Sequence, residues 1–99
     1  MAIGQDRRAE VRRTADIAVV VRVYGRSPFP GVLQDISPGG AMLRTNTSGL
    51  NVGDEVVIRF NDIEVVATIA WRKGRFSGLS FHRRLVSREM LTMRIASLA

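Results

Sequence analysis

Short β-prone segments, separated by turn-forming residues, are the feature that most constrains the fold of this chain. The first, DIAVVVRVYG at residues 16–25, is rich in β-branched side chains and is followed by a Ser, Pro and Gly cluster at 27–31. β-branched residues suit the pleated surface of a strand, whereas Gly and Pro favour turns. Further strands are expected at residues 31–36, 41–45, 55–60, 63–71 and 78–81. Six short strands predict a mainly β fold, a small antiparallel barrel or sandwich, and we favour a six-stranded antiparallel β-barrel.

The two ends of the chain lack this strand pattern. Residues 1–13, MAIGQDRRAEVRR, are polar and charged and are predicted to form an arm or a single irregular turn. After Phe81 the spacing becomes helical, with Ser87 suited to the N-cap and Glu89 to the positive end of the helix dipole. The apolar residues of this helix are expected to pack on the barrel or to form a dimer contact: Met90, Leu91, Ile95 and Leu98.

Length and composition bound the class of protein. Ninety-nine residues with 45% hydrophobic content suit one domain, with an arm at 1–13, a barrel at 14–81 and a helix at 87–98. There is no cysteine and a single histidine, His82, so no metal site is expected. The longest apolar run, Ile17–Val21, is too short to span a membrane, and the N-terminus lacks the apolar region of a signal peptide. We therefore expect a cytoplasmic protein without membrane insertion.

The charge distribution points to an anionic partner. The net charge is +6 and the pI is near 11.4. Residues 1–26 hold six Arg against three acids, and residues 72–94 hold seven Lys or Arg against one Glu, whereas the middle of the chain is acidic. Nucleic acid, a nucleotide or an acidic lipid would each satisfy such a surface, and so would a solubilising role with no partner.

Catalytic signatures are missing from the sequence. It contains no phosphate-binding loop of the form G-x-x-x-x-G-K-[ST], no G-x-G-x-x-G and no G-x-S-x-G elbow. A Ser-His-acid arrangement would have to recruit His82, and a lone histidine at the end of a strand is more often structural. The acids near turns are expected to face solvent: Asp54, Glu55, Asp62 and Glu64. The sequence therefore predicts a protein that is not an enzyme.

The stretch DISPGG, at residues 35–40, combines with the arginines of the arm in a way that suits a guanine nucleotide. Guanine presents O6 and N7 as acceptors for an Arg fork, and its N1–H and N2–H₂ groups are donors for a carboxylate. Arg also binds phosphate in bidentate fashion. The stretch supplies Asp35, Ser37 and glycine backbone, and the arm supplies Arg7, Arg8, Arg12 and Arg13. A simple turn would explain DISPGG equally well from its residue types alone.

The chain resembles the PilZ domain, a bacterial receptor module for the second messenger cyclic di-GMP. The family pattern is R-x-x-x-R in an N-terminal arm, filled here by Arg8 and Arg12 in RAEVR, followed by [DN]-x-S-x-x-G, filled by DISPGG. The later stretch VVATIAWRKGRFSGLSF is similar to the family's strand ending in Trp, its basic turn and its G-[hydrophobic]-x-F strand. The resemblance covers Gln5 to Phe81.

This resemblance implies a function and a set of binding residues. Arg8 and Arg12 would hold phosphates and guanines of cyclic di-GMP, while Asp35, Ser37 and Gly40, with the backbone of Gly39, would hold a guanine at the barrel surface. The arm would close over the ligand and present a new surface to an unknown downstream protein. The expected protein is a non-enzymatic bacterial receptor, either a monomer or a homodimer.

Arg7 bears on the number of ligands. In this family an Arg directly before R-x-x-x-R is associated with binding an intercalated pair of cyclic di-GMP molecules, so we hypothesise two ligands per chain. The pair carries four phosphate charges, which makes an additional guanidinium physically sensible. The alternative is that Arg7 is a solvated residue of the arm.

Two other functions remain open from the sequence. A basic nucleic-acid-binding barrel would show steep salt dependence, but the chain has few aromatic residues for base stacking. A protein-only adaptor could keep the fold without the ligand. In the tail of the barrel, Trp71 is expected to pack in the core or at the rim, and Gly74 and Gly78 are expected to serve turn geometry. The basic residues Arg72, Lys73 and Arg75 are expected to form a solvated turn.

Overall fold

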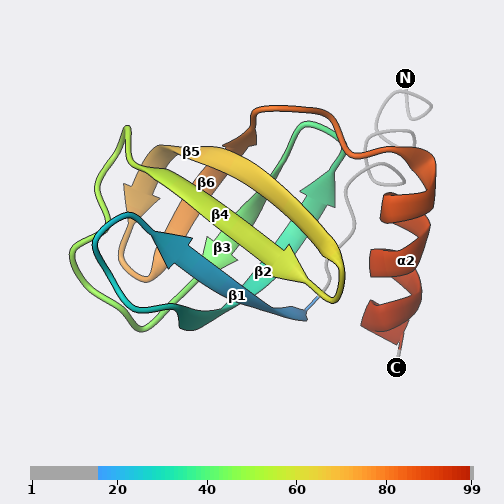
Figure 1. Cartoon of the computed structure of the whole chain (residues 1–99), viewed down its shortest axis with the longest axis horizontal. Helices are drawn as coiled ribbons and strands as arrows, with labels where there is room; N and C mark the ends of the chain where they lie inside the picture. The colour runs from blue at the N-terminus through green and yellow to red at the C-terminus, as the bar shows by residue number, and fades with distance from the viewer. Residues whose placement is uncertain (1–15, 99) are drawn as a thin grey trace, which may run out of the picture.

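A computed structural model describes residues 16–98 as a closed β-barrel followed by one helix (Figure 1). The elements are β1 (Ile17–Val23), β2 (Phe29–Ser37), β3 (Gly40–Arg44), β4 (Glu55–Phe60), β5 (Ile63–Lys73), β6 (Phe76–Phe81) and α2 (Ser87–Leu98). The strand order is β1-β2-β3-β6-β5-β4, every neighbouring pair is antiparallel, and β4 pairs with β1 to close the barrel. The predicted six-stranded antiparallel barrel with a C-terminal helix is confirmed.

Alternation of side chains along the strands builds the core. In β1 the side chains of Ile17, Val19 and Val21 are buried, while the residues between them are exposed. The same pattern holds in β4, where Val56 and Ile58 face inward. Successive side chains of a strand point to opposite faces, so a closed barrel gathers one half of each strand into a single apolar interior.

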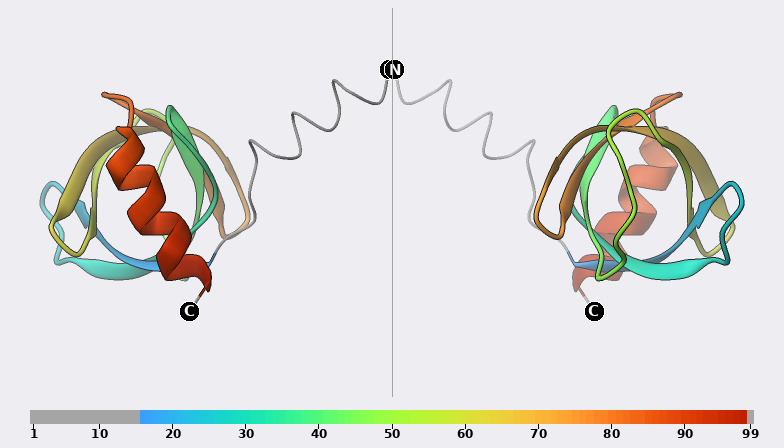
Figure 2. Two further views of the ribbon diagram at one scale, coloured as in Figure 1. Left: turned by 90° about the vertical axis from the view of Figure 1, so that its right-hand side faces the viewer. Right: turned by 90° about the vertical axis from the view of Figure 1, so that its left-hand side faces the viewer.

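Each open end of the barrel is covered by a segment that contributes to the core. Figure 2 shows α2 lying across one end and the loop between β3 and β4 crossing the opposite end. Met93 of α2 and Leu85 just before the helix are buried, as is Leu50 in the loop. Both covers therefore complete the apolar interior that the six strands enclose.

The helix turns a different face to the barrel from the one that the sequence indicated. Met93 is buried and Met90 packs partly against the core, whereas Leu91 is 53% exposed and Ile95 is 59% exposed. The helix carries apolar residues on two sides, and the short connection from β6 decides which side meets the barrel. Met90 thus packs on the barrel as expected, whereas Leu91 and Ile95 do not, and a dimer contact through these two residues stays a prediction. The side chain of Leu98 lies outside the described part of the chain.

The helix also begins differently at its first turn. The carbonyl of Val86 accepts the first helical hydrogen bond, from the amide of Met90 (3.0 Å), and the Val86 amide donates to Oε1 of Glu89 (2.9 Å). Val86 is therefore the N-cap, and Glu89 fills the position of the acidic residue in a capping box. Ser87, the predicted N-cap, is the first residue inside the helix.

No helical segment within residues 16–98 has the length and hydropathy that crossing a lipid bilayer requires.

Two strands begin two residues earlier than predicted, and one glycine has a different role. β2 begins at Phe29 instead of Gly31, and β6 begins at Phe76 instead of Gly78. Gly78 thus lies inside a strand, where a Cβ would collide with the indole ring of Trp71. Gly74, with φ of +61°, is the turn glycine of this hairpin, as predicted.

Candidate functional site

The DISPGG stretch is more than a turn, because its first three residues belong to β2. The register of β2 against β3 shifts between Gln34 and Ser37, which is a β-bulge. Leu33 and Ile36 are both buried although they lie three positions apart, so the extra residue of the bulge is accommodated between them. Asp35 has a φ of +49°, a left-handed conformation that Asp tolerates better than most residues with a side chain.

The bulge determines which way the polar side chains face. With strict alternation, Asp35 and Ser37 would point inward with Leu33, since they share its parity along the strand. The bulge reverses the parity, so Ile36 enters the core while Asp35 and Ser37 are both half-buried. These two side chains therefore lie at the barrel surface and can be reached by a ligand.

Ser37 and Gly40 are paired residues on the two sides of a tight connection made by Pro38 and Gly39. The Ser37 hydroxyl donates a hydrogen bond to the Gly40 carbonyl oxygen at 3.2 Å. A hydroxyl that donates its only hydrogen keeps lone pairs with which it can accept. The Ser37 oxygen can therefore accept a further hydrogen bond, two residues along the strand from Asp35.

Gly40 is required by the close approach of two strands. A Cβ at this position would collide with the backbone carbonyl of Leu79, on the neighbouring strand β6. A backbone oxygen cannot move aside as a flexible side chain can. The glycine at the end of DISPGG thus allows β3 and β6 to pair closely directly beside Ser37.

The last residue of β6 and the segment that follows it hold the DISPGG turn from outside. The amide of Phe81 donates to the carbonyl of Gly39 (2.9 Å), and the amide of Leu85 donates to the carbonyl of Pro38 (2.8 Å). In Figure 1 the connection from β6 to α2 passes over the turn between β2 and β3. Two backbone hydrogen bonds therefore fix the turn at the end of the barrel that α2 covers. The connection, residues 82–86, is the third element of the candidate site.

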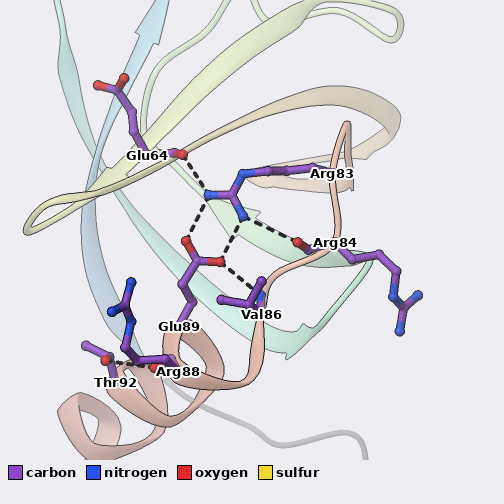
Figure 3. Close-up of polar contacts among 7 residues, drawn as sticks. All are labelled: Glu64, Arg83, Arg84, Val86, Arg88, Glu89 and Thr92. Carbon is purple, nitrogen blue, oxygen red and sulfur yellow. Dashed lines mark hydrogen bonds and ion pairs between the residues drawn. The ribbon is translucent and has the colours of Figure 1, made fainter.

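The connection is itself fixed by an ion pair. Arg83 binds Glu89 through both nitrogens of its fork, at 2.8 and 2.9 Å, and also donates to the Glu64 carbonyl on β5 at 3.1 Å (Figure 3). The hydrogen bonds from Arg83, followed by the one from the Val86 amide, lower the pKa of Glu89 to about 2. The hydrogen bond to Glu89 likewise raises the pKa of Arg83. The ion pair ties α2 to the connection, and the hydrogen bond from Arg83 to the Glu64 carbonyl ties both to the barrel.

The chain enters β1 at the same end of the barrel. Asp16, the residue before β1, accepts a hydrogen bond of 2.6 Å from the side-chain amide of Gln34, which neighbours Asp35. The point where residues 1–15 join the barrel is thereby held next to the bulge. The predicted arm ligands Arg7, Arg8 and Arg12 lie outside the described residues.

The structure brings together four of the predicted site residues, Asp35, Ser37, Gly39 and Gly40, within one hairpin. It also adds Arg84, which the sequence reasoning did not single out. A Cβ built on Gly39 would lie 3.9 Å from Nη1 of Arg84, so this guanidinium lies against the turn. The sequence does not show that Arg84 lies against the turn, because Arg83 and Arg84 are adjacent residues of the same type.

The only histidine of the sequence takes part in a cross-strand contact. His82 Nε2 lies 2.7 Å from the Thr68 hydroxyl, and Nδ1 lies 3.8 Å from the carboxylate of Glu55. Glu55 and Thr68 are direct partners in the β4–β5 pair, and the amide of His82 donates to the Val66 carbonyl on β5, which brings the ring to these two groups. The His82 side chain is 43% exposed, which places the contact on the outer surface of the barrel.

Trp71 packs at the rim, as expected from the sequence. Its ring lies over the bare backbone of Gly78, its partner on β6, and the residue is 45% exposed. The register of this pair shifts between Ile69 and Trp71, so a second bulge turns the indole onto the glycine. An aromatic ring over a glycine in a neighbouring strand shields backbone that would otherwise be open to water.

Fold and site together define a small β-barrel binding module, with acceptor groups at a fixed turn beside the point where the chain enters the barrel. The sequence matches the family model of the PilZ domain over residues 6–94, so the chain belongs to the PilZ domain family. The resemblance on which the sequence analysis relied is thereby confirmed. The family is a receptor family for cyclic di-GMP, and its members are binding modules instead of enzymes. A comparison with curated proteins found no match.

Proposed function

We propose that this protein binds cyclic di-GMP at the DISPGG hairpin and relays the signal to a downstream protein by closing its N-terminal arm. The observation that carries the proposal is the bulge in β2, which turns Asp35 and Ser37 to the surface. The Asp35 carboxylate and the Ser37 hydroxyl oxygen both offer hydrogen-bond acceptors. Guanine offers the complementary donors, N1–H and N2–H₂, on one edge of the base.

The arm supplies the positive charge that the hairpin lacks. Arg8 and Arg12 match the arginines of the family motif, and we assign them to the phosphates and guanines of the ligand. The Asp16 to Gln34 hydrogen bond holds the base of the arm beside the hairpin. Because a ligand shifts an equilibrium only through its different affinity for the two states, arginines on the arm itself are the natural means of coupling binding to closure.

Calorimetric titration with cyclic di-GMP tests the proposal, with GMP and a short oligonucleotide as controls. We expect saturable heat with cyclic di-GMP alone. Slower hydrogen exchange in residues 1–15 on adding the ligand would report closure of the arm. Binding of the oligonucleotide that weakens steeply with salt, without heat from cyclic di-GMP, would contradict the proposal and assign the basic surface to nucleic acid.

The stoichiometry of the same titration tests the role of Arg7. We propose that Arg7 helps to hold an intercalated pair of ligands, so the wild type binds two molecules per chain and Arg7→Ala binds one. One ligand per chain in the wild type would leave Arg7 as a solvated residue and would not affect the proposed receptor function.

A further inference from the structure

Arg83 and Arg84 are neighbours in the sequence with different surroundings in the structure. The Arg83 guanidinium donates hydrogen bonds to the carboxylate of Glu89 and to the carbonyl of Glu64. Figure 3 shows the Arg84 side chain pointing away from this ion pair. Arg84 is exposed, and within residues 16–98 neither a carboxylate nor a carbonyl accepts a hydrogen bond from its guanidinium.

The backbone fixes Arg84 beside the candidate site. Its neighbour Leu85 is buried and donates to the Pro38 carbonyl at 2.8 Å. On the other side, Arg83 binds Glu89, so the residues flanking Arg84 are both anchored. The Arg84 guanidinium lies within contact distance of the place where a side chain on Gly39 would begin. A cation is therefore held over the turn while its donors remain available.

The phosphates of cyclic di-GMP are the expected partners of the Arg84 guanidinium. The acceptors Asp35 and Ser37 select the donor edge of guanine, and neither offers a positive charge for the phosphates of the same ligand. A guanidinium binds a phosphate through two parallel hydrogen bonds, and such charge-assisted pairs are stronger than neutral ones. On the basis of the proposed function, we infer that Arg84 is a phosphate-binding residue of the site, contributed by the barrel itself instead of by the arm.

The experiment compares Arg84→Ala with Arg75→Ala in calorimetric titrations with cyclic di-GMP. Arg75 is an exposed arginine in the turn between β5 and β6, at the other end of the barrel, so its loss changes the net charge equally. We expect Arg84→Ala to weaken binding by roughly 10-fold to 100-fold, the range for a hydrogen bond to a charged group. Arg75→Ala should stay within about twofold of the wild type, as for a remote surface charge.

Arg84→Lys and the salt dependence test whether Arg84 contributes through its planar fork, through its charge, or through both. Melting temperatures exclude an effect on folding. Lys keeps the positive charge without the planar fork, so its affinity should fall between those of the wild type and Arg84→Ala. The affinity of Arg84→Ala should also depend less on salt than that of the wild type, because one screened charge contact is gone. Equal melting temperatures for the variants and the wild type are the control for folding.

Each outcome decides between the inference and the function on which it rests. If the wild type binds and Arg84→Ala binds as tightly as Arg75→Ala, Arg84 is a solvated residue and the inference alone is overturned. If the wild type gives no heat with cyclic di-GMP, the proposed function is wrong and the inference is overturned with it.

Discussion

The β2–β3 and β5–β6 hairpins differ in what constrains their turns. Both turns contain glycine, and they lie at opposite ends of the barrel. In the first, a Cβ on Gly40 would collide with the Leu79 carbonyl, and the amides of Phe81 and Leu85 hold the turn. In the second, Gly74 has φ of +61° with nothing within 4 Å of an added Cβ. Residue types thus identify both as turns, whereas tertiary contacts distinguish the candidate site from an ordinary turn.

The largest expected effect comes from placing a methyl group in each hairpin. Gly40→Ala should lower the free energy of unfolding by about 3 kcal/mol or more, because the backbone of β6 cannot yield without disturbing the sheet. Gly74→Ala should cost about 1 kcal/mol, which is the penalty for a left-handed conformation alone. Urea denaturation of the two variants measures both values. Equal losses would mean that the two hairpins are constrained to the same degree.

The next effect concerns the carboxylate of the bulge. Asp35→Asn keeps a residue that tolerates φ of +49°, so the fold should be preserved while the charge is lost. We expect the affinity for cyclic di-GMP to fall by about 2 kcal/mol, the contribution of a hydrogen bond to a charged group. Asp62→Asn, an exposed aspartate in the turn between β4 and β5, is the matched control. Unchanged binding by Asp35→Asn would remove this carboxylate from the site.

A smaller effect follows from breaking the ion pair that fixes the connection. Glu89→Gln should lower the free energy of unfolding at pH 7 by about 1 kcal/mol, because solvent screens a pair in which Arg83 is 47% exposed. The pKa of Glu89 falls on folding from the ordinary 4.5 to about 2. A carboxyl whose pKa is lower in the folded state stabilises the protein above pH 4.5, and this contribution is lost as the pH falls toward 2. The difference between wild type and variant should therefore vanish over that window.

Hydrogen exchange measures which hairpin loses stability in Glu89→Gln. The Leu85 amide bonds to Pro38 of the β2–β3 turn, and the Thr45 amide bonds to Arg75 of the β5–β6 turn. Glu89→Gln should speed exchange at Leu85 and leave Thr45 unchanged. Faster exchange at both amides would indicate that the ion pair stabilises the barrel as a whole.

The smallest effect is expected from Ser77→Ala, which is compared with Ser37→Ala. Ser77 on β6 is fully buried, and its hydroxyl has no hydrogen-bond partner among the described residues. Ser77→Ala should leave the free energy of unfolding within about 0.5 kcal/mol of the wild type, because the substitution removes no hydrogen bond. Ligand binding should be unchanged. Ser37→Ala should instead weaken ligand binding by about 1 kcal/mol, as for a neutral hydrogen bond. A larger stability loss at Ser77 would point to a partner such as a buried water.

Much of the fold could be predicted from periodicity. β1 and β4 show strict alternation between buried and exposed residues, and both were expected from the sequence. The helix was predicted in the right place, but its contact face was not, because Leu91 and Ile95 are as apolar as the Met90 and Met93 side that packs. When a helix has two apolar sides, its connections and neighbours decide which one is buried.

The candidate site was predicted only as a set of residues. The motif gave Asp35, Ser37, Gly39 and Gly40, and the structure assigns three different tasks within that set: surface acceptors, a turn carbonyl that accepts from Phe81, and a close approach to Leu79. Arg84 was missed because a local pattern cannot show which of two adjacent arginines is occupied by an ion pair.

The sequence by itself determined the family, the number of strands and the residues of the motif, since these follow from short-range periodicity and from residues close together in the chain. Tertiary structure decided the direction in which those residues face. The bulge between Gln34 and Ser37 exists only because β2 pairs with β3, and it turns Asp35 to the surface. Long-range contacts likewise decided that Gly40 cannot carry a side chain and that Arg83 is bound while Arg84 faces the turn. Register, close approach and ion pairing depend on distances between segments far apart in the chain, which no local pattern specifies.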